Sequence, residues 1–88
     1  MDTDYTIAYI GLGSDLGDRA GNLLLAVRAL VEAFFDVCKL SAIYETEPIG
    51  IESDVNFLNM VVEIRVTNVS PTQMMARLLR IEIGRAHV

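Results

Sequence analysis

The sequence predicts an α+β domain in which two helices pack on one face of a small sheet. Short runs rich in β-branched and aromatic residues alternate along the chain with two segments of helical periodicity. The strand-like runs are residues 6–12, 39–45 and 57–66, and the helical segments begin at Asp18 and Pro71. Because 88 residues make one small domain at most, we expect a single domain over residues 1–88.

The first predicted strand, residues 6–12, leads into the glycines Gly11 and Gly13, which are typical of a strand that enters a turn. The period then changes, because apolar residues recur at steps of three and four after Asp18. Asp18 is placed to cap the first turn of a helix over residues 18–34. The predicted apolar stripe of this helix is Ala20, Leu23, Leu24, Val27, Leu30, Val31 and Phe34.

Two further strands are expected in the middle of the chain. Residues 39–45 alternate, with Leu40, Ala42 and Tyr44 on one face. Residues 46–55 are long for a connection, so we expect this loop to line a site. Alternation is clearest in residues 57–66. The core face of this last strand would consist of Leu58, Met60, Val62, Ile64 and Val66.

The second helix has a recognisable start, because residues 70–73 form a capping box with Pro71 at the first helical position. Gly84 is placed to end it, and its predicted apolar stripe is Met74, Met75, Leu78 and Ile81. The resulting order, β-α-β-β-α, matches a ferredoxin-like two-layer sandwich that lacks its fourth strand. In that fold the fourth strand flanks the first, so residues 7–12 would form an open apolar edge, which we expect to pair with a second copy as a homodimer.

The amino-acid composition limits the binding partners and the cellular location that we expect for this protein. The chain is 52% hydrophobic and 22% charged, as is typical of a folded domain. A net charge of −5, with seven scattered Lys and Arg residues, argues against nucleic acid as a partner. The apolar runs are too short to cross a membrane, and the polar start and single cysteine predict a cytoplasmic location. We expect that cysteine, Cys38, to be buried and inert.

The residues most suited to binding a ligand are Phe57 and Asn59. If helices cover the Met60 side of the last strand, these two share its opposite face, beside the 46–55 loop. An aromatic ring offers a stacking surface, and a carboxamide offers one acceptor and two donors, which suits the edge of a flat heterocycle. The alternative is that Phe57 packs across strands and Asn59 is solvated, and spacing alone favours this alternative.

Two other patterns have structural explanations that we prefer. Glycines in residues 11–17 resemble a variant dinucleotide-binding turn, but a plain strand-to-helix turn explains them as well. The acidic pairs Glu45/Glu47 and Glu52/Asp54 could be metal ligands, although loop solvation explains them more simply. We therefore predict neither a catalytic residue nor a metal ligand in this chain.

Four motifs together resemble the 6-hydroxymethyl-7,8-dihydropterin pyrophosphokinase family. They are residues 8–19, 44–50, 56–59 and the Pro71 helix with its continuation to Arg85, in that order and at fitting distances. Within the first motif, Asp15 stands where the family usually has Asn. The resemblance covers essentially the whole chain, but only about the amino-terminal half of a family member.

The resemblance implies a transfer of diphosphate from ATP to the hydroxymethyl group of a reduced pterin, a folate-pathway step assisted by two Mg²⁺ ions. It implies that Phe57 stacks on the pterin, that Asn59 pairs with its edge, and that the region of Thr46 and Ile49 covers it. It also places four residues near the nucleotide: Met75, Leu79, Glu82 and Arg85.

The family's metal-binding Asp-x-Asp, carried on its fourth strand, has no counterpart here, and neither does the Arg/Trp-rich segment before it. We therefore expect the chain to retain the pterin-binding half and to be inactive alone, because phosphoryl transfer depends on those charges. The alternative is a non-catalytic module that binds a small ligand or an interaction partner at its strand edge.

Overall fold

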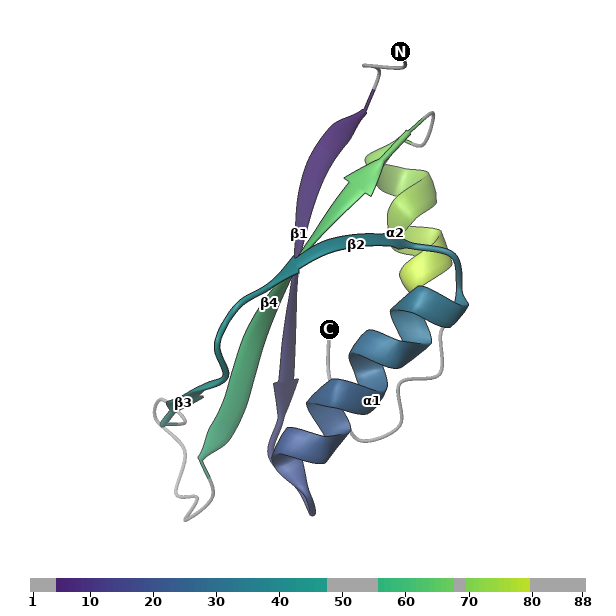
Figure 1. Ribbon diagram of the computed structural model, residues 1–88. Helices are drawn as coiled ribbons and strands as arrows, with labels where there is room; N and C mark the ends of the chain where they lie inside the picture. Colours follow the sequence, from purple (N-terminus) through teal and green to yellow (C-terminus); the bar gives the residue numbers. More distant parts are fainter. Residues whose placement is uncertain (1–4, 48–55, 68–69, 80–88) are drawn as a thin grey trace.

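The longest strand, β4, lies at the centre of the sheet and pairs with each of the other described strands. The computed structural model describes residues 5–47, 56–67 and 70–79 (Figure 1). Its elements are β1 (Thr6–Ser14), α1 (Arg19–Glu32), β2 (Asp36–Leu40), β3 (Tyr44–Thr46), β4 (Phe57–Val66) and α2 (Pro71–Leu79). β4 pairs antiparallel with β1 on one side, and with β2 and β3 on the other.

Figure 1 shows α1 and α2 on the same side of the sheet, so the molecule has one helical layer and one sheet layer. The predicted α+β class is confirmed, and the arrangement is that of a ferredoxin-like sandwich lacking a strand. In the part of the chain that the structure describes, β1 pairs with β4 alone and therefore forms one edge of the sheet. No helix among these residues is long and apolar enough to cross a membrane.

The core lies between the sheet and α1, with Leu78 of α2 added at one end. Met60, Val62 and Ile64 of β4 are buried, and Leu58 and Val66 pack beside them, so the predicted core face of this strand is confirmed. The other buried apolar side chains are Ile10, Leu12, Leu23, Ala26, Leu30, Phe35 and Leu78. Each large side chain of this kind stabilises the fold by about 1.5–3 kcal/mol when fully buried.

The predicted apolar stripe of α1 is partly wrong. Leu23 and Leu30 are buried as expected, but Leu24 and Val31 are more than half exposed. Ala26, which the stripe omitted, is fully buried. The reason is geometric, because residues at i, i+3 and i+7 face the sheet squarely, and Leu24 and Val31 lie one step further round the helix.

Phe34 departs most from its prediction, because its side chain is 91% exposed. α1 ends at Glu32, and its last turn is closed by two bonds, from the Phe34 amide to the Val31 carbonyl (3.0 Å) and from the Phe35 amide to the Leu30 carbonyl (3.1 Å). This is a Schellman ending, and it places Phe34 at a φ of 68°, where glycine is usual. The following residue, Phe35, enters the core instead.

The second predicted strand is two short strands in the structure. β2 has a register shift between Val37 and Lys39, and it stops at Leu40. The Ser41 hydroxyl accepts a hydrogen bond from the Val61 amide (2.8 Å), so a side chain takes the place of a main-chain partner and the regular ladder is interrupted. Leu40, Ala42 and Tyr44 are all exposed, and this face is not part of the core. Cys38 is exposed too, so its predicted burial is wrong.

The glycines of the first strand lie inside β1, which extends to Ser14, and the predicted end at residue 12 is therefore too early. Because β2 runs antiparallel beside β4, the strand after α1 is not a parallel neighbour of β1. A dinucleotide-binding unit needs such a parallel pair, so that alternative is excluded.

Both predicted helix starts are confirmed. Asp18 caps α1, because its carboxylate accepts a hydrogen bond from the Gly21 amide (3.1 Å). The capping box of α2 is reciprocal: the Ser70 hydroxyl accepts from the Gln73 amide (3.2 Å), and the Gln73 side chain accepts from the Ser70 amide (2.9 Å). Leu78 is buried and Met74 packs against the core, whereas Met75 is exposed. Ile81 and Gly84 lie outside the described residues.

Candidate functional site

The candidate site is on the face of the sheet opposite the helices, at the beginning of β4. Phe57 and Asn59 lie on this face because Leu58 and Met60 between and after them point into the core. The register places Gly13 of β1 and Tyr44 of β3 on either side of Asn59, and Thr46 opposite Phe57. Directly opposed residues of antiparallel strands share a face, so these residues form one surface.

The side-chain amide of Asn59 is held in one orientation. Its nitrogen donates a hydrogen bond to the Thr46 hydroxyl, with a distance of 2.7 Å between Nδ2 and Oγ1. Its oxygen is directed toward β1, where a Cβ added at Gly13 would stand 3.0 Å away. Gly13 therefore leaves the space that the amide oxygen occupies. The remaining N–H and the oxygen of Asn59 can serve a ligand as one donor and one acceptor.

A shallow hollow of about 260 Å³ opens beside this amide. The lining residues come from β1, β3 and β4, and they are Gly11, Leu12, Gly13, Tyr44, Phe57, Asn59 and Met60. The glycines provide the room, since a Cβ at Gly11 would meet nothing within 4 Å. Two aromatic rings, Tyr44 and Phe57, border the space, so a flat ring could stack there while its edge meets the amide.

Arg19, the first residue of α1, connects β3 with the start of β4 from the helical side of the sheet. Its Nη1 lies 2.6 Å from the carbonyl oxygen of Asn56, directly before β4, and 3.2 Å from Oε2 of Glu45 in β3. Glu45 faces the helices because it stands opposite Leu58, while its neighbours Tyr44 and Thr46 lie on the opposite face of the sheet. One guanidinium thus links β3 to the residue directly before β4, at two of the three strands that line the hollow.

Acidic side chains are dispersed over the residues that the structure describes. No group of three or more His, Cys, Asp or Glu side chains gathers in them, and Glu45 is paired with Arg19. Glu52 and Asp54 lie outside the described residues.

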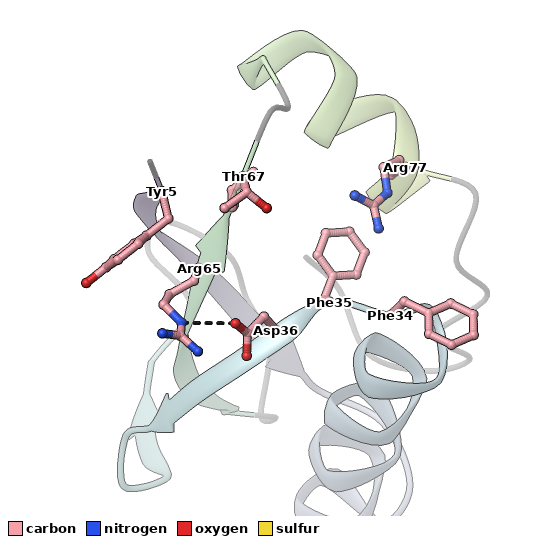
Figure 2. Close-up of a pocket in the computed structure, with 8 residues that line it drawn as sticks. Tyr5, Phe34, Phe35, Asp36, Arg65, Thr67 and Arg77 are labelled. Carbon is pink, nitrogen blue, oxygen red and sulfur yellow. Dashed lines mark hydrogen bonds and ion pairs between the residues drawn. The ribbon is translucent and has the colours of Figure 1, made fainter. Parts of the chain in front are cut away.

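A second hollow, of about 300 Å³, lies at the far end of β4 (Figure 2). From Phe57 to Arg65 the strand covers eight steps, or about 26 Å. Figure 2 shows Arg65 and Asp36 pointing toward one another, with Nε and Oδ2 2.9 Å apart, and this carboxylate raises the pKa of Arg65. Arg77 lies over the ring of Phe35, 4.6 Å from its centre. Since the charges of Arg65 and Asp36 already pair with one another, we do not place the candidate site here.

The structure brings together three of the predicted site residues, Thr46, Phe57 and Asn59. Met75 is exposed on α2, in the helical layer and not on the open face. Ile49, Glu82 and Arg85 lie outside the described residues, as does the side chain of Leu79, which ends α2. The roles of all eight predicted site residues stay predictions.

Sequence reasoning from spacing missed Gly13, Tyr44 and Arg19. All three stand in motifs noted in the sequence, but the side-chain pattern does not tell which residue of one strand opposes which residue of another. That information is the register, and it is visible only in the folded sheet.

Comparisons with known proteins point in one direction. A family model described as 7,8-dihydro-6-hydroxymethylpterin-pyrophosphokinase (HPPK) matches residues 9–87. A 2-amino-4-hydroxy-6-hydroxymethyldihydropteridine pyrophosphokinase of Bacillus subtilis (strain 168) is 47% identical over 82 residues, covering 90% of this chain and 48% of that relative. A protein with the same description from Aquifex aeolicus (strain VF5) is 37% identical over 79 residues, covering 88% of this chain and 48% of the relative.

A folate synthesis bifunctional protein of Arabidopsis thaliana is 32% identical over 80 residues, covering 91% of this chain and 16% of that protein. The chain spans about half the length of the two bacterial relatives.

Proposed function

The chain belongs to the 7,8-dihydro-6-hydroxymethylpterin-pyrophosphokinase family, and we propose that its open sheet face binds the pterin ring of a folate-pathway diphosphate transfer. The observation that carries the proposal is the oriented amide of Asn59, bonded to Thr46 and standing beside Phe57 and the hollow. On this proposal, the whole protein transfers diphosphate from ATP to the hydroxymethyl group of 6-hydroxymethyl-7,8-dihydropterin, with Mg²⁺ as cofactor.

The chemistry of the site fits a flat ring with a mixed hydrogen-bonding edge. A pyrimidinone edge both donates and accepts, and the Asn59 amide offers one N–H and one oxygen for such an edge. The rings of Phe57 and Tyr44 border the hollow and can exclude water from the ring faces. A purely apolar ligand would leave the N–H and the oxygen of the Asn59 amide without hydrogen-bond partners. The site should therefore prefer a ring with polar edges.

ATP binding is assigned to Met75, Leu79, Glu82 and Arg85 only by family resemblance. We propose that residues 1–88 have no turnover by themselves, because the family's metal-binding aspartates have no counterpart in them. An assay of this chain with the pterin, ATP and Mg²⁺ tests the proposal directly. ATP-dependent formation of the diphosphate product by these 88 residues would contradict it. The cytoplasmic location likewise stays a prediction.

The pterin-binding proposal is tested by titrating the chain with 6-hydroxymethylpterin and following amide signals by NMR. We expect shifts at Thr46, Phe57 and Asn59. Phe57→Ala and Asn59→Asp should each weaken binding about tenfold, which corresponds to losing a stacked ring or one well-placed hydrogen bond. Phe34→Ala is the matched control, because this exposed ring lines the second hollow and not the candidate site, and it should leave the affinity unchanged.

A folded sample in which the ligand moves none of these signals would overturn the pterin-binding proposal. The non-catalytic module would then be the better explanation, and its own expected signature is self-association or partner binding at the β1 edge. Shifts confined to residues around Arg65 and Asp36 would instead move the ligand site to the second hollow.

A further inference from the structure

Arg19 occupies a position that the pterin-binding proposal does not use. We propose that Arg19 is a positioning residue for the pterin site, acting by holding β3 against the beginning of β4 from the helical side. The inference rests on the proposed function, and it concerns the atoms that shape the site rather than any contact with the ligand. Its basis is the pair of bonds from Nη1 to the Asn56 carbonyl and the Glu45 carboxylate.

The two acceptors of Arg19 are direct chain neighbours of the residues that form the site. Asn56 precedes Phe57, and the 2.6 Å bond to its carbonyl orients the peptide that leads into that residue. Glu45 precedes Thr46, whose hydroxyl receives the Asn59 amide at 2.7 Å. A shift of either acceptor would therefore change the separation of the Phe57 ring from the Asn59 amide.

β3 needs such a link because few other contacts hold it among the described residues. The strand has three residues, all of them exposed, and it pairs only with β4 in the described residues. Short strands without a buried face are marginally stable on their own. The side-chain links to β3 recorded in the described residues are Thr46 with Asn59 and Glu45 with Arg19.

Arg19 belongs to the first turn of α1, which side-chain hydrogen bonds attach to the sheet. Asp18 caps the helix, and the Asn22 side chain donates to the carbonyl of Leu16 (2.8 Å) and to the hydroxyl of Ser14 (3.2 Å). Ser14 ends β1 and is fully buried, so these bonds join the start of α1 to the sheet. Movement of Arg19 relative to β4 is thereby limited.

The bond to Asn56 carries more of the effect than the pair with Glu45. An exposed ion pair contributes little to stability, and the Glu45 side chain is half exposed. A cationic donor on a part-buried main-chain carbonyl forms a shorter and stronger bond. Because both contacts use the same nitrogen, a lysine could supply them in part, although it lacks the planar fork of arginine.

The test compares four forms of the chain: wild type, Arg19→Gln, Arg19→Lys and Arg28→Gln. Arg28 is the matched control, because it is an arginine on the same helix with a Glu partner, and it lies exposed and away from the site. For each form we would measure the unfolding midpoint in urea, the NMR signals of the Asn59 side-chain amide and of Thr46 without ligand, and the dissociation constant for 6-hydroxymethylpterin.

We expect Arg19→Gln to shift the Asn59 and Thr46 signals and to weaken pterin binding about tenfold in the fully folded sample. Arg19→Lys should recover most of the affinity, and Arg28→Gln should match the wild type. Unchanged Asn59 and Thr46 signals in Arg19→Gln would overturn the inference. The inference would also be overturned if binding decreased only in proportion to the fraction of folded protein, and by the same factor in Arg19→Gln and Arg19→Lys.

The two proposals fail separately. If the wild type does not bind the pterin, the proposed function is wrong, and the unliganded signals of Asn59 and Thr46 still decide whether Arg19 positions these residues. If the wild type binds and Arg19→Gln binds equally well, the positioning role is wrong and the pterin site stands.

Discussion

At the scale of single residues, the candidate site depends on one amide and the glycine beside it. Asn59 can present its donor and acceptor to a ligand only if the amide does not rotate. Thr46 holds its nitrogen, and the absence of a side chain at Gly13 makes room for its oxygen. The orientation is therefore determined from both sides, as an accurate hydrogen-bonding site requires.

Replacing Gly13 with alanine should disturb this arrangement. The new Cβ would stand 3.0 Å from the amide oxygen of Asn59 and 3.6 Å from Cδ1 of Phe57, so the amide must move by a few tenths of an ångström. We expect shifted Asn59 side-chain signals and about fivefold weaker pterin binding, equivalent to roughly 1 kcal/mol. Gly11→Ala is the control for the amide signals, because its Cβ meets nothing within 4 Å. Equal Asn59 spectra in both variants would contradict this account.

Phe34 shows the opposite situation, a residue whose conformation costs stability. Its φ of 68° disfavours any side chain with a Cβ, and its exposed ring contributes little burial in return. Phe34→Gly should raise the free energy of unfolding by about 0.5–1 kcal/mol, after allowance for the greater freedom of glycine in the unfolded chain. Urea denaturation measures this change.

The neighbouring Phe35 provides the contrast, since it is buried and Phe35→Ala should lower the free energy of unfolding by about 3 kcal/mol. A decrease in stability for Phe34→Gly would mean that the exposed ring makes contacts beyond those described.

At the scale of elements, the strands differ in what holds them. β4 is secured by paired strands on both edges and a buried face, whereas β3 is held by a three-residue pairing with β4 and a few side-chain bonds. The described part of α2 has nine residues, and helices of that length are marginal without tertiary contacts and a capped end. Its reciprocal capping box and the burial of Leu78 supply both.

Removing the cap should therefore be measurable. Ser70→Ala deletes the hydroxyl that accepts from the Gln73 amide, and we expect a loss of about 1 kcal/mol in the free energy of unfolding. Thr72→Ala, an exposed position one residue before Gln73, is the control and should change stability by less than about 0.5 kcal/mol. Equal effects of the two substitutions would show that the capping box contributes nothing specific.

At the scale of the whole molecule, the one-sided sheet explains why a ligand site can exist here at all. Both helices lie on one face, so no described helix covers the other face, which can present an aromatic ring, an amide and two glycines to a ligand. The same architecture places β1 at an edge of the described sheet. Unpaired edges of regular strands can accept a strand from another chain.

Self-association through β1 stays a prediction, and sedimentation at rising protein concentration tests it. Ile7→Glu should shift the population toward monomer, because a charge on an edge strand disfavours pairing with a second copy, and its cross-strand neighbour is Arg65. Leu24→Glu introduces the same charge on an exposed position of α1 and should have no effect. A wild type that sediments as a monomer at every concentration would refute the prediction.

The parts of this protein that the sequence determines by itself are local. The alternation of β4 defines its buried side, because successive side chains of a strand must point to opposite faces. The caps at Asp18 and Ser70 are equally local, since each involves residues three apart. The choice of Phe57 and Asn59 as a candidate pair follows from the same alternation, and the residues alone could not decide between a ligand site and ordinary packing.

Tertiary structure decides what depends on residues far apart in the chain. The burial of Ala26 rather than Leu24 is set by where α1 meets the sheet, and the division of residues 39–45 into two strands is set by the bonding of Ser41 to Val61. The register brings Gly13 and Tyr44 to Asn59, and the start of α1 brings Arg19 to Glu45 and Asn56. A sequence pattern specifies which face a side chain occupies, but only the packed fold fixes which distant residue stands opposite.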